Sequence, residues 1–307
     1  MSDGDFEPES WSAFDDHGAH GEKGNAGCAV FILVIVLVAI VGDIAGSRFE
    51  EANCKGKDFE LFTDYCFFTD DSVLTMAIAA ALVEWKKTGG DLRELAVDQL
   101  HLFGLRYPDC GFGLKFLEWI PGFDHRPYDS WGNGSAMRVS PVGWAGNSLD
   151  ETIAMSDAVT RVTHNHPEGM AGAAITAACV YMARTGASMK EMREYVTKTY
   201  SDLSFTLDSI RENYVFDVSC RGSVPQALEA FFESTSFEDA IRNAISIGGD
   251  SDTIGAITGS IAGAYYGVPT DIRDKTLSYL DDFQRETISE FEALWLSRPH
   301  GFQSHML

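Results

Sequence analysis

Apolar residues along this chain recur mainly at intervals of three and four, which is the spacing of one face of an amphipathic helix. This spacing predicts helices over residues 72–85, 92–103, 148–162, 168–184, 189–200, 225–233, 237–245, 253–266 and 271–295. Alternation of apolar and polar residues with a period of two, bounded by hairpin turns, is nearly absent. The pattern therefore predicts an all-α fold, a compact helical bundle.

One apolar segment, residues 28–41, has no polar face and ends at Gly42 and Asp43. Its length of about 14 residues falls short of the roughly 20 that a membrane-spanning helix needs. A signal peptide is disfavoured, because the preceding region is acidic and no small-x-small site follows before Asp43. We expect the C-terminal half of the segment to be a buried helix. Membrane association through residues 28–41 is the less favoured alternative, since the β-branched part is longer than a core helix requires.

The pattern divides the chain into a tail and one domain. Residues 1–27 are polar, glycine-rich and acidic, which is typical of a disordered tail. No linker rich in proline and serine interrupts residues 42–307, so we expect them to form a single domain. One face of the predicted helix 253–266 carries glycine at every fourth position, which would let a neighbouring helix approach closely. These residues are Gly255, Gly259, Gly263 and Gly267.

Composition narrows the function classes. The 307 residues include 46 Asp and Glu against 23 Lys and Arg, a formal net charge of −23. This excess argues against direct nucleic-acid binding, which needs a basic face to neutralise phosphates. The six cysteines lack CxxC spacing and suggest neither a zinc site nor a disulfide framework. They are typical of reduced thiols, so we expect a cytoplasmic protein.

Two acidic clusters lie far apart in the sequence, within residues 68–72 and 247–253. Carboxylate and hydroxyl oxygens are the ligands that a hard divalent cation such as Mg²⁺ prefers. Each cluster stands where a loop becomes a helix, so capping of the first-turn N–H groups is the alternative for either cluster alone. Gly248 and Gly249 let the backbone bend sharply beside the second cluster. The oxygen-bearing residues are Thr69, Asp70, Asp71, Asp250, Asp252 and Thr253.

Further candidate residues come from separate segments, each of which is a weak signal by itself. Glu50 closes the motif formed by residues 42–50. The glycine-rich loop 129–138 exposes backbone N–H groups, which commonly bind phosphate oxygens. His164 and His166 directly precede a predicted helix and could serve as ligands or as capping groups.

In this order, the five motifs resemble those of the ADP-ribosylglycohydrolase family, over roughly Val38 to Gly267. The resemblance implies an all-α domain whose cleft holds two Mg²⁺ or Mn²⁺ ions and binds ADP-ribose. The implied metal ligands are Thr69, Asp70, Asp71, Asp250, Asp252 and Thr253.

The resemblance also implies catalytic and substrate-binding residues. Glu50 matches the family's glutamate near the scissile bond, and Asp70 and Asp252 join it as catalytic candidates. For Asp43 and Arg138, a buried charged pair or a cap that shapes the loops is at least as good an explanation. The implied substrate-binding residues are Gly111, Gly113, Ser130, Trp131, Gly132, Asn133, Gly134 and His164.

The function implied is a metal-dependent hydrolase that removes ADP-ribose from a modified protein side chain, with arginine as the first candidate. The expected partners are the ADP-ribosylated protein and ADP-ribose. The alternative is a non-catalytic ADP-ribose-binding or crystallin-like structural member of the same fold. Such members differ by the loss of metal ligands, and none is lost in this sequence.

Overall fold

The computed structural model describes residues 31–32, 35–122 and 124–295. The expected tail, residues 1–27, lies outside the described residues, as do positions 28–30 and 33–34 of the apolar run. Residues 35–41 of that run are packed into the core, where they are at most 1% exposed. No helix within the described part of the chain is both long and apolar enough to cross a membrane.

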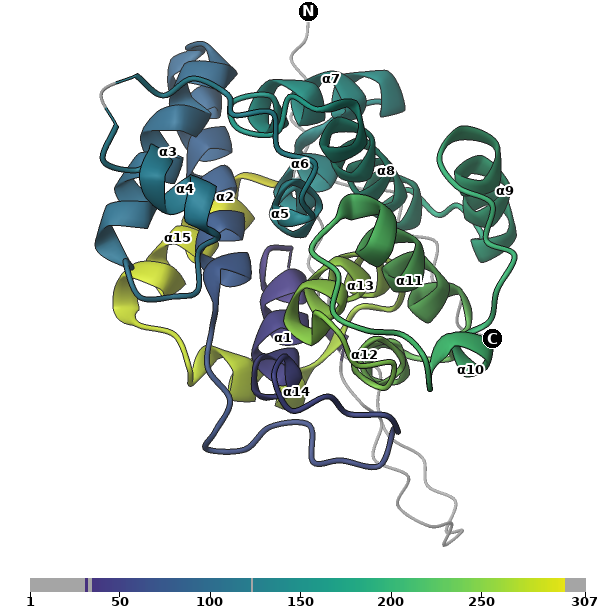
Figure 1. Cartoon of the computed structure of the whole chain (residues 1–307). Helices are drawn as coiled ribbons and strands as arrows, with labels where there is room; N and C mark the ends of the chain where they lie inside the picture. The colour runs from purple at the N-terminus through teal and green to yellow at the C-terminus, as the bar shows by residue number, and fades with distance from the viewer. Residues whose placement is uncertain (1–30, 33–34, 123, 296–307) are drawn as a thin grey trace, which may run out of the picture.

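Helices account for almost all of the regular structure, so the all-α prediction is confirmed (Figure 1). Two strands of two residues each, β1 (Phe31–Ile32) and β2 (Val268–Pro269), pair antiparallel. The helices are α1 (Leu37–Gly46), α2 (Asp70–Thr88), α3 (Leu92–Arg106), α4 (Leu114–Trp119), α5 (Gly134–Met137), α6 (Ser140–Ala145), α7 (Leu149–Thr160), α8 (Pro167–Arg184), α9 (Met189–Thr199), α10 (Leu207–Ile210), α11 (Cys220–Phe232), α12 (Phe237–Ile245), α13 (Ser251–Tyr266), α14 (Thr270–Leu277) and α15 (Asp282–Trp295), with the short 3₁₀ helix η1 (Ser47–Phe49).

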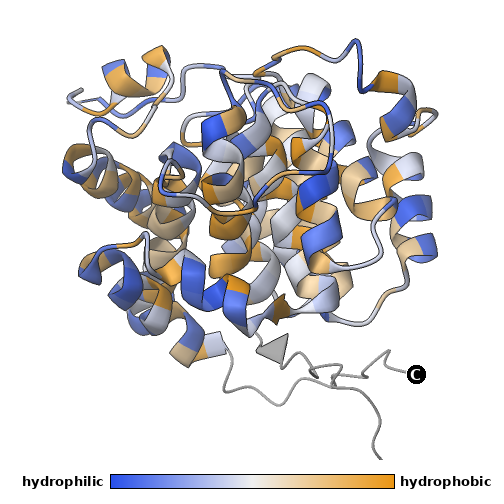
Figure 2. Ribbon diagram, turned by 90° about the horizontal axis from the view of Figure 1, so that it is seen from below, coloured by the Kyte–Doolittle hydropathy of each residue, from blue (hydrophilic) through white to orange (hydrophobic). Residues whose placement is uncertain are grey.

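The helices surround a central pair, α1 and α13 (Figure 1). Helix α2 packs against α1, α3 and α15 on one side, and α8, α11 and α12 pack against α13 on the other. Most of the peripheral helices carry both apolar and hydrophilic residues around their circumference, as Figure 2 shows. The core therefore lies along the central pair, whose own residues are buried on nearly all sides.

The glycine face of α13 is the surface that contacts α1. A Cβ atom placed on Gly255 would lie 2.6 Å from the carbonyl oxygen of Gly42, and one on Gly259 would lie 2.5 Å from that of Val38. Such distances are shorter than any real Cβ contact, so these positions admit only glycine. Gly267 departs from the expected stripe, because it follows α13 as its C-cap with a φ of 76°.

Most predicted helices differ from the structure by up to three residues at an end, and two differ more. The helix expected from residue 225 begins at Cys220, because the Ser219 hydroxyl caps it by accepting a hydrogen bond from the Gly222 N–H at 2.8 Å. The segment expected as one helix over 271–295 is broken into α14 and α15. Asp281 starts the second of these, since its carboxylate accepts from the Gln284 N–H at 2.9 Å and the Gln284 side chain accepts from the Asp281 N–H.

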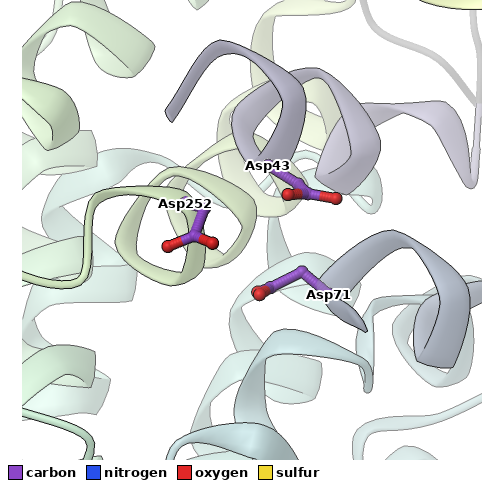
Figure 3. Close-up of side chains that lie close together, drawn as sticks. All are labelled: Asp43, Asp71 and Asp252. Carbon is purple, nitrogen blue, oxygen red and sulfur yellow. The ribbon is translucent and has the colours of Figure 1, made fainter. Parts of the chain in front are cut away.

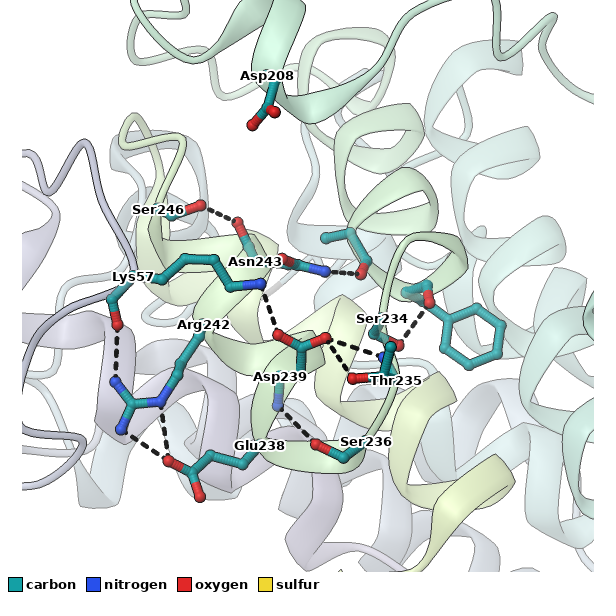
Figure 4. Close-up of polar contacts among 12 residues, drawn as sticks. Lys57, Asp208, Ser234, Thr235, Ser236, Glu238, Asp239, Arg242, Asn243 and Ser246 are labelled. Atoms are coloured by element: carbon teal, nitrogen blue, oxygen red, sulfur yellow. Dashed lines mark hydrogen bonds and ion pairs between the residues drawn. The ribbon is translucent and has the colours of Figure 1, made fainter.

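The loop that follows η1 is tied to α12 by charged side chains (Figure 4). The Lys57 ammonium lies 2.5 Å from the Asp239 carboxylate. Arg242 donates to the carbonyl oxygens of Lys57 and Phe59 at 2.9 and 2.7 Å. This loop begins at Glu50, so its attachment helps to fix the backbone next to that glutamate.

We predict that Gly255→Ala destabilises the protein by about 2 kcal/mol or more, because the new methyl group meets the α1 backbone. At an unhindered helix position the same change would stabilise by up to about 1 kcal/mol. Gly56→Ala is the matched control, since a Cβ at Gly56 meets nothing within 4 Å. Denaturant unfolding measures both free energies. A Gly255→Ala chain as stable as the parent would contradict the contact.

Candidate active site

A cavity of about 740 Å³ opens between the starts of α2 and α13 and the loops before α4 and α5. The structure places on its wall every catalytic, substrate-binding and metal-ligand residue that the resemblance implied. These residues are Glu50, Thr69, Asp70, Asp71, Gly111, Gly113, Ser130, Trp131, Gly132, Asn133, Gly134, His164, Asp250, Asp252 and Thr253. His166 lies elsewhere and caps α8, where its ring nitrogen Nδ1 accepts from the Glu168 N–H at 3.2 Å.

The two acidic clusters meet at the bottom of this cavity. Asp71 stands in the first turn of α2 and Asp252 in the first turn of α13, and Figure 3 shows them converging with Asp43 of α1. The glycine contact makes this possible, because a Cβ on Gly46 would lie 2.6 Å from the Cα of Asp252. The close helix crossing thus sets how far the carboxylates of α1 and α13 stand apart.

Asp43 fastens the start of α2. Its carboxylate accepts hydrogen bonds from the N–H and hydroxyl of Thr69, at 3.0 and 2.8 Å, and from the N–H of Ser72 at 3.1 Å. The Ser72 hydroxyl donates to it as well. Asp43 is therefore a cap for α2, one of the roles considered for it from the sequence.

Hydroxyl and amide groups orient the remaining carboxylates. The hydroxyls of Thr69 and Thr253 lie 3.3 and 3.1 Å from the Oδ2 atom of Asp71. The Asn133 side chain donates to Oδ2 of Asp250 at 2.7 Å. Each of these contacts joins segments that are distant in the sequence or turns a side chain inward, so the acidic groups are held in fixed directions.

The arrangement suits divalent cations. Oδ1 of Asp71 and Oδ1 of Asp252 are buried and have no hydrogen-bond partner among the described residues. Ligand atoms of Asp43, Asp71 and Asp252 lie within 4.8 Å of one another, and so do those of Glu50, Asp250 and Asp252. Buried carboxylate oxygens without donors are costly unless a cation binds them. The donor set, all oxygen, matches the preference of Mg²⁺ or Mn²⁺.

Crowding of the carboxylates shifts their protonation. Burial, reinforced by repulsion from neighbouring carboxylates, raises the pKa of Asp70, Asp71 and Asp252 well above the usual range. Burial also raises the pKa of Asp43 to about 6, against the hydrogen bonds from Ser72 and Thr69 that lower it. A bound cation would reverse this by favouring the charged forms.

Glu50 lies at the edge of the acidic group, directly after η1, and is partly buried. Burial raises its pKa, and repulsion from Asp250 adds to the rise. Its loop is held against the second acidic segment, where the Asn53 side chain accepts from the Gly249 N–H at 2.7 Å. Lys55 donates to the carbonyl oxygen of Ile247 at 2.5 Å. The backbone after Glu50 and the turn before Asp250 are therefore one connected unit.

The glycine-rich loop forms the opposite wall. Trp131 is 46% exposed beside the opening, which leaves its ring free to stack on a ligand. The Asn133 N–H donates to the carbonyl oxygen of Val218 at 2.8 Å, and the Cys220 thiol lies 3.2 Å from that of Gly132. Cys220 is fully buried, so its role is structural.

The structure adds residues that sequence patterns did not single out as lining the cavity. Several of them are apolar side chains that are exposed at the mouth of the cavity. In the sequence, the signal that could have found them is an apolar residue beside a recognised motif, because apolar surface next to a site commonly contacts a ligand. The added residues include Phe67, Asp109, Cys110, Leu114, Lys115, Tyr128, Phe216 and Val218.

Comparison with known proteins establishes the family. The model of the ADP-ribosylglycohydrolase family matches residues 32–300. The chain belongs to this family. It is 32% identical over 241 residues to the ADP-ribosyl-[dinitrogen reductase] glycohydrolase of Rhodospirillum rubrum, and this match covers 74% of this chain and 78% of that relative. It is 25% identical over 269 residues to the ADP-ribosylhydrolase ARH3 of Mus musculus, spanning 67% of this chain and 71% of the relative.

A solved structure of an ADP-ribosylglycohydrolase-related protein complex shares the fold, with a TM-score of 0.63 at 24% identity. The match covers 86% of this chain and 96% of that structure. The resemblance inferred from the motifs is thus confirmed. As a member of this family, the chain is a hydrolase of glycosidic bonds.

We predict that, when EDTA has removed metal ions, the acidic cluster makes the protein more stable as the pH falls. The carboxyls of the cluster have higher pKa values in the folded state than in the unfolded state. Their protonation therefore stabilises the folded state, and this stabilisation is fully present below the unperturbed pKa of 3.8. It is lost as the pH rises through the folded pKa, about 6 for Asp43. Urea unfolding in EDTA between about pH 5 and pH 7.5 measures the effect.

The Asp71→Asn, Asp252→Asn double variant is the control for this prediction, because other carboxyls in the chain shift in the opposite direction. As the pH falls, the free energy of unfolding should rise less for the variant than for the parent. Mn²⁺ should stabilise the parent more than the variant at the higher pH. Equal pH dependence in the two proteins would refute the electrostatic account.

Proposed function

We propose that this chain is a metal-dependent hydrolase that removes ADP-ribose from a modified protein side chain, with arginine as the preferred acceptor. The observation that carries the proposal is the convergence of buried aspartates, two of them with oxygen atoms lacking any donor among the described residues, beneath one cavity. The relative from Rhodospirillum rubrum is named for ADP-ribose on a protein, which supports a protein substrate.

The metal ligands in this proposal are Thr69, Asp70, Asp71, Asp250, Asp252 and Thr253. When bound, two divalent cations would supply positive charge that polarises the ribose hydroxyls and a water molecule. Asp43 supports the ligands by capping α2, and Asn133 keeps Asp250 turned toward the cleft. These hydrogen bonds restrict how the carboxylates can turn within the cleft.

Glu50 is our candidate for proton transfer at the glycosidic bond, with Asp70 and Asp252 as further catalytic candidates. The bond breaks through an oxocarbenium-like state, in which the leaving nitrogen or oxygen needs a proton. Glu50 lines the cavity, and its raised pKa favours holding a proton at the edge of the metal group. In this proposal, the 130–134 loop and His164 on the far wall bind the rest of ADP-ribose, which their place in the cavity lining supports.

The charge of the cleft favours arginine as the acceptor. Six acidic side chains line the cavity against two basic ones, Lys115 and Arg138. Glu50 and Asp109 are not among the proposed metal ligands, so both stay available to a guanidinium group as it leaves. A cationic leaving group donates charge-assisted hydrogen bonds to these carboxylates. An uncharged serine hydroxyl lacks the positive charge that strengthens such bonds.

We expect the purified chain to release ADP-ribose from an arginine-linked substrate with Mg²⁺ or Mn²⁺, and to stop when EDTA is added. The double variant Asp70→Ala, Asp252→Ala should be slower by about 100-fold or more, because the cation site is lost. Chromatography of released ADP-ribose measures both, with serine-linked and nucleic-acid-linked substrates in parallel. The proposal fails if no linkage is cleaved under any metal, or if the variant matches the parent.

Glu50→Gln should lower kcat by about 100-fold while the Kd for ADP-ribose changes little, since proton transfer contributes mainly at the transition state. Glu51→Gln is the matched control, because Glu51 is the exposed neighbouring residue and does not line the cavity. Steady-state kinetics and titration calorimetry separate the two quantities. A similar kcat for both variants would remove Glu50 from the mechanism.

A further inference from the structure

Behind the glycine-rich loop, three buried side chains form a chain of hydrogen bonds that ends at the cavity. A guanidinium nitrogen of Arg138, Nη2, lies 2.6 Å from the hydroxyl oxygen of Thr163. The same hydroxyl lies 2.8 Å from Nδ1 of His164. Arg138, Thr163 and His164 are 1%, 0% and 5% exposed. Arg138 and His164 both line the cavity.

The chemistry of these groups gives the chain a direction. A guanidinium has donors and no acceptor, so Arg138 must donate and the Thr163 oxygen must accept. The charged donor polarises that hydroxyl, which makes its own proton a better donor to Nδ1 of His164. With Nδ1 accepting, the ring proton of a neutral imidazole sits on Nε2.

The surrounding charge keeps the imidazole neutral. Burial lowers the pKa of His164 well below its usual value, and the positive charges of Arg138 and Lys115 lower it further. Arg138 therefore acts in two ways, since it orients the Thr163 hydroxyl and disfavours a second proton on the ring. At neutral pH His164 offers one donor, the Nε2–H group.

That donor faces the loop that we assign to ADP-ribose. A Cβ on Gly134 would lie 3.3 Å from Nε2, and one on Gly132 would lie 3.8 Å from it. The two glycines thus leave open space beside the ring nitrogen. No residue in the described part of the chain forms a hydrogen bond with Nε2, so the donor is available to a ligand.

The geometry points to Thr163 and Arg138 as positioning residues that fix His164 as a neutral Nε2–H donor for an acceptor oxygen of the ligand. The identity of that ligand as ADP-ribose rests on the proposed function, whereas the tautomer does not. His164 in this role recognises a ribose or phosphate oxygen and transfers no proton. Arg138, the one fully buried cation on the wall, gains a role beyond shaping the loop.

One arrangement competes with this assignment. If Nδ1 carried the proton, Thr163 would accept from both neighbours and its own proton would have to go elsewhere. The phenol of Tyr128 is the group that could take it. Burial raises the pKa of Tyr128, and a hydrogen bond from Thr163 opposes part of that rise. The Tyr128 ring lies 6.0 Å from that of His164. Removal of this phenol oxygen therefore separates the two arrangements.

Nitrogen-15 NMR of the imidazole resonances in the ligand-free, full-length protein tests the assignment, with His164→Gln identifying the signals. We expect the Nε2–H tautomer in the parent, in Thr163→Ser, which keeps the hydroxyl, and in Tyr128→Phe. Thr163→Val should give a mixture of tautomers, and should weaken ADP-ribose binding by about threefold to tenfold. Titration calorimetry measures the affinity.

An Nδ1–H tautomer in the parent or in Tyr128→Phe would overturn the assignment, as would an unchanged tautomer in Thr163→Val. If Thr163→Val does not fold, Thr163→Ser and Tyr128→Phe still decide the tautomer. Failure of the proposed function gives a different result, in which the NMR signature is as expected but ADP-ribose does not bind to the parent protein.

Discussion

The close crossing of α1 and α13 is the contact on which the rest of the site depends. The backbones meet through Gly42 and Gly255, where even one added methyl group would lie within 2.6 Å of a carbonyl oxygen. Asp43 follows directly on one helix, and Asp252 lies one turn earlier on the other. Two carboxylates from opposite ends of the chain can face each other only because no side chain separates the helices here.

That crossing brings together groups that repel one another. Burial and mutual repulsion raise the pKa of several aspartates, so the folded chain carries an electrostatic cost at this point. The rest of the core, which includes the apolar residues from Ile35 to Val41, offsets the cost. The hydrogen bonds from Thr69 and Ser72 hold the Asp43 carboxylate in place, so this group cannot turn away to relieve the repulsion.

The two walls of the cavity differ in chemical character. One wall presents carboxylates and hydroxyls, which suit cations and proton transfer at Glu50. The other presents donors, namely the backbone of the 130–134 loop and the Nε2–H group that we assign to His164. A ligand with hydroxyl groups at one end and phosphate groups at the other complements this pair of walls. The family assignment and the proposed substrate class agree with that division.

Local residue patterns by themselves determined the helical fold, the acidic clusters at two helix starts and the family, because periodicity, caps and motif order depend on short stretches of chain. They also indicated the glycine face of α13, but not that α1 is its partner. Tertiary structure alone decided that Asp43 caps α2 and that Arg138 reaches His164 through Thr163. Each of those contacts joins side chains whose distance is set by helix packing, which no local pattern encodes.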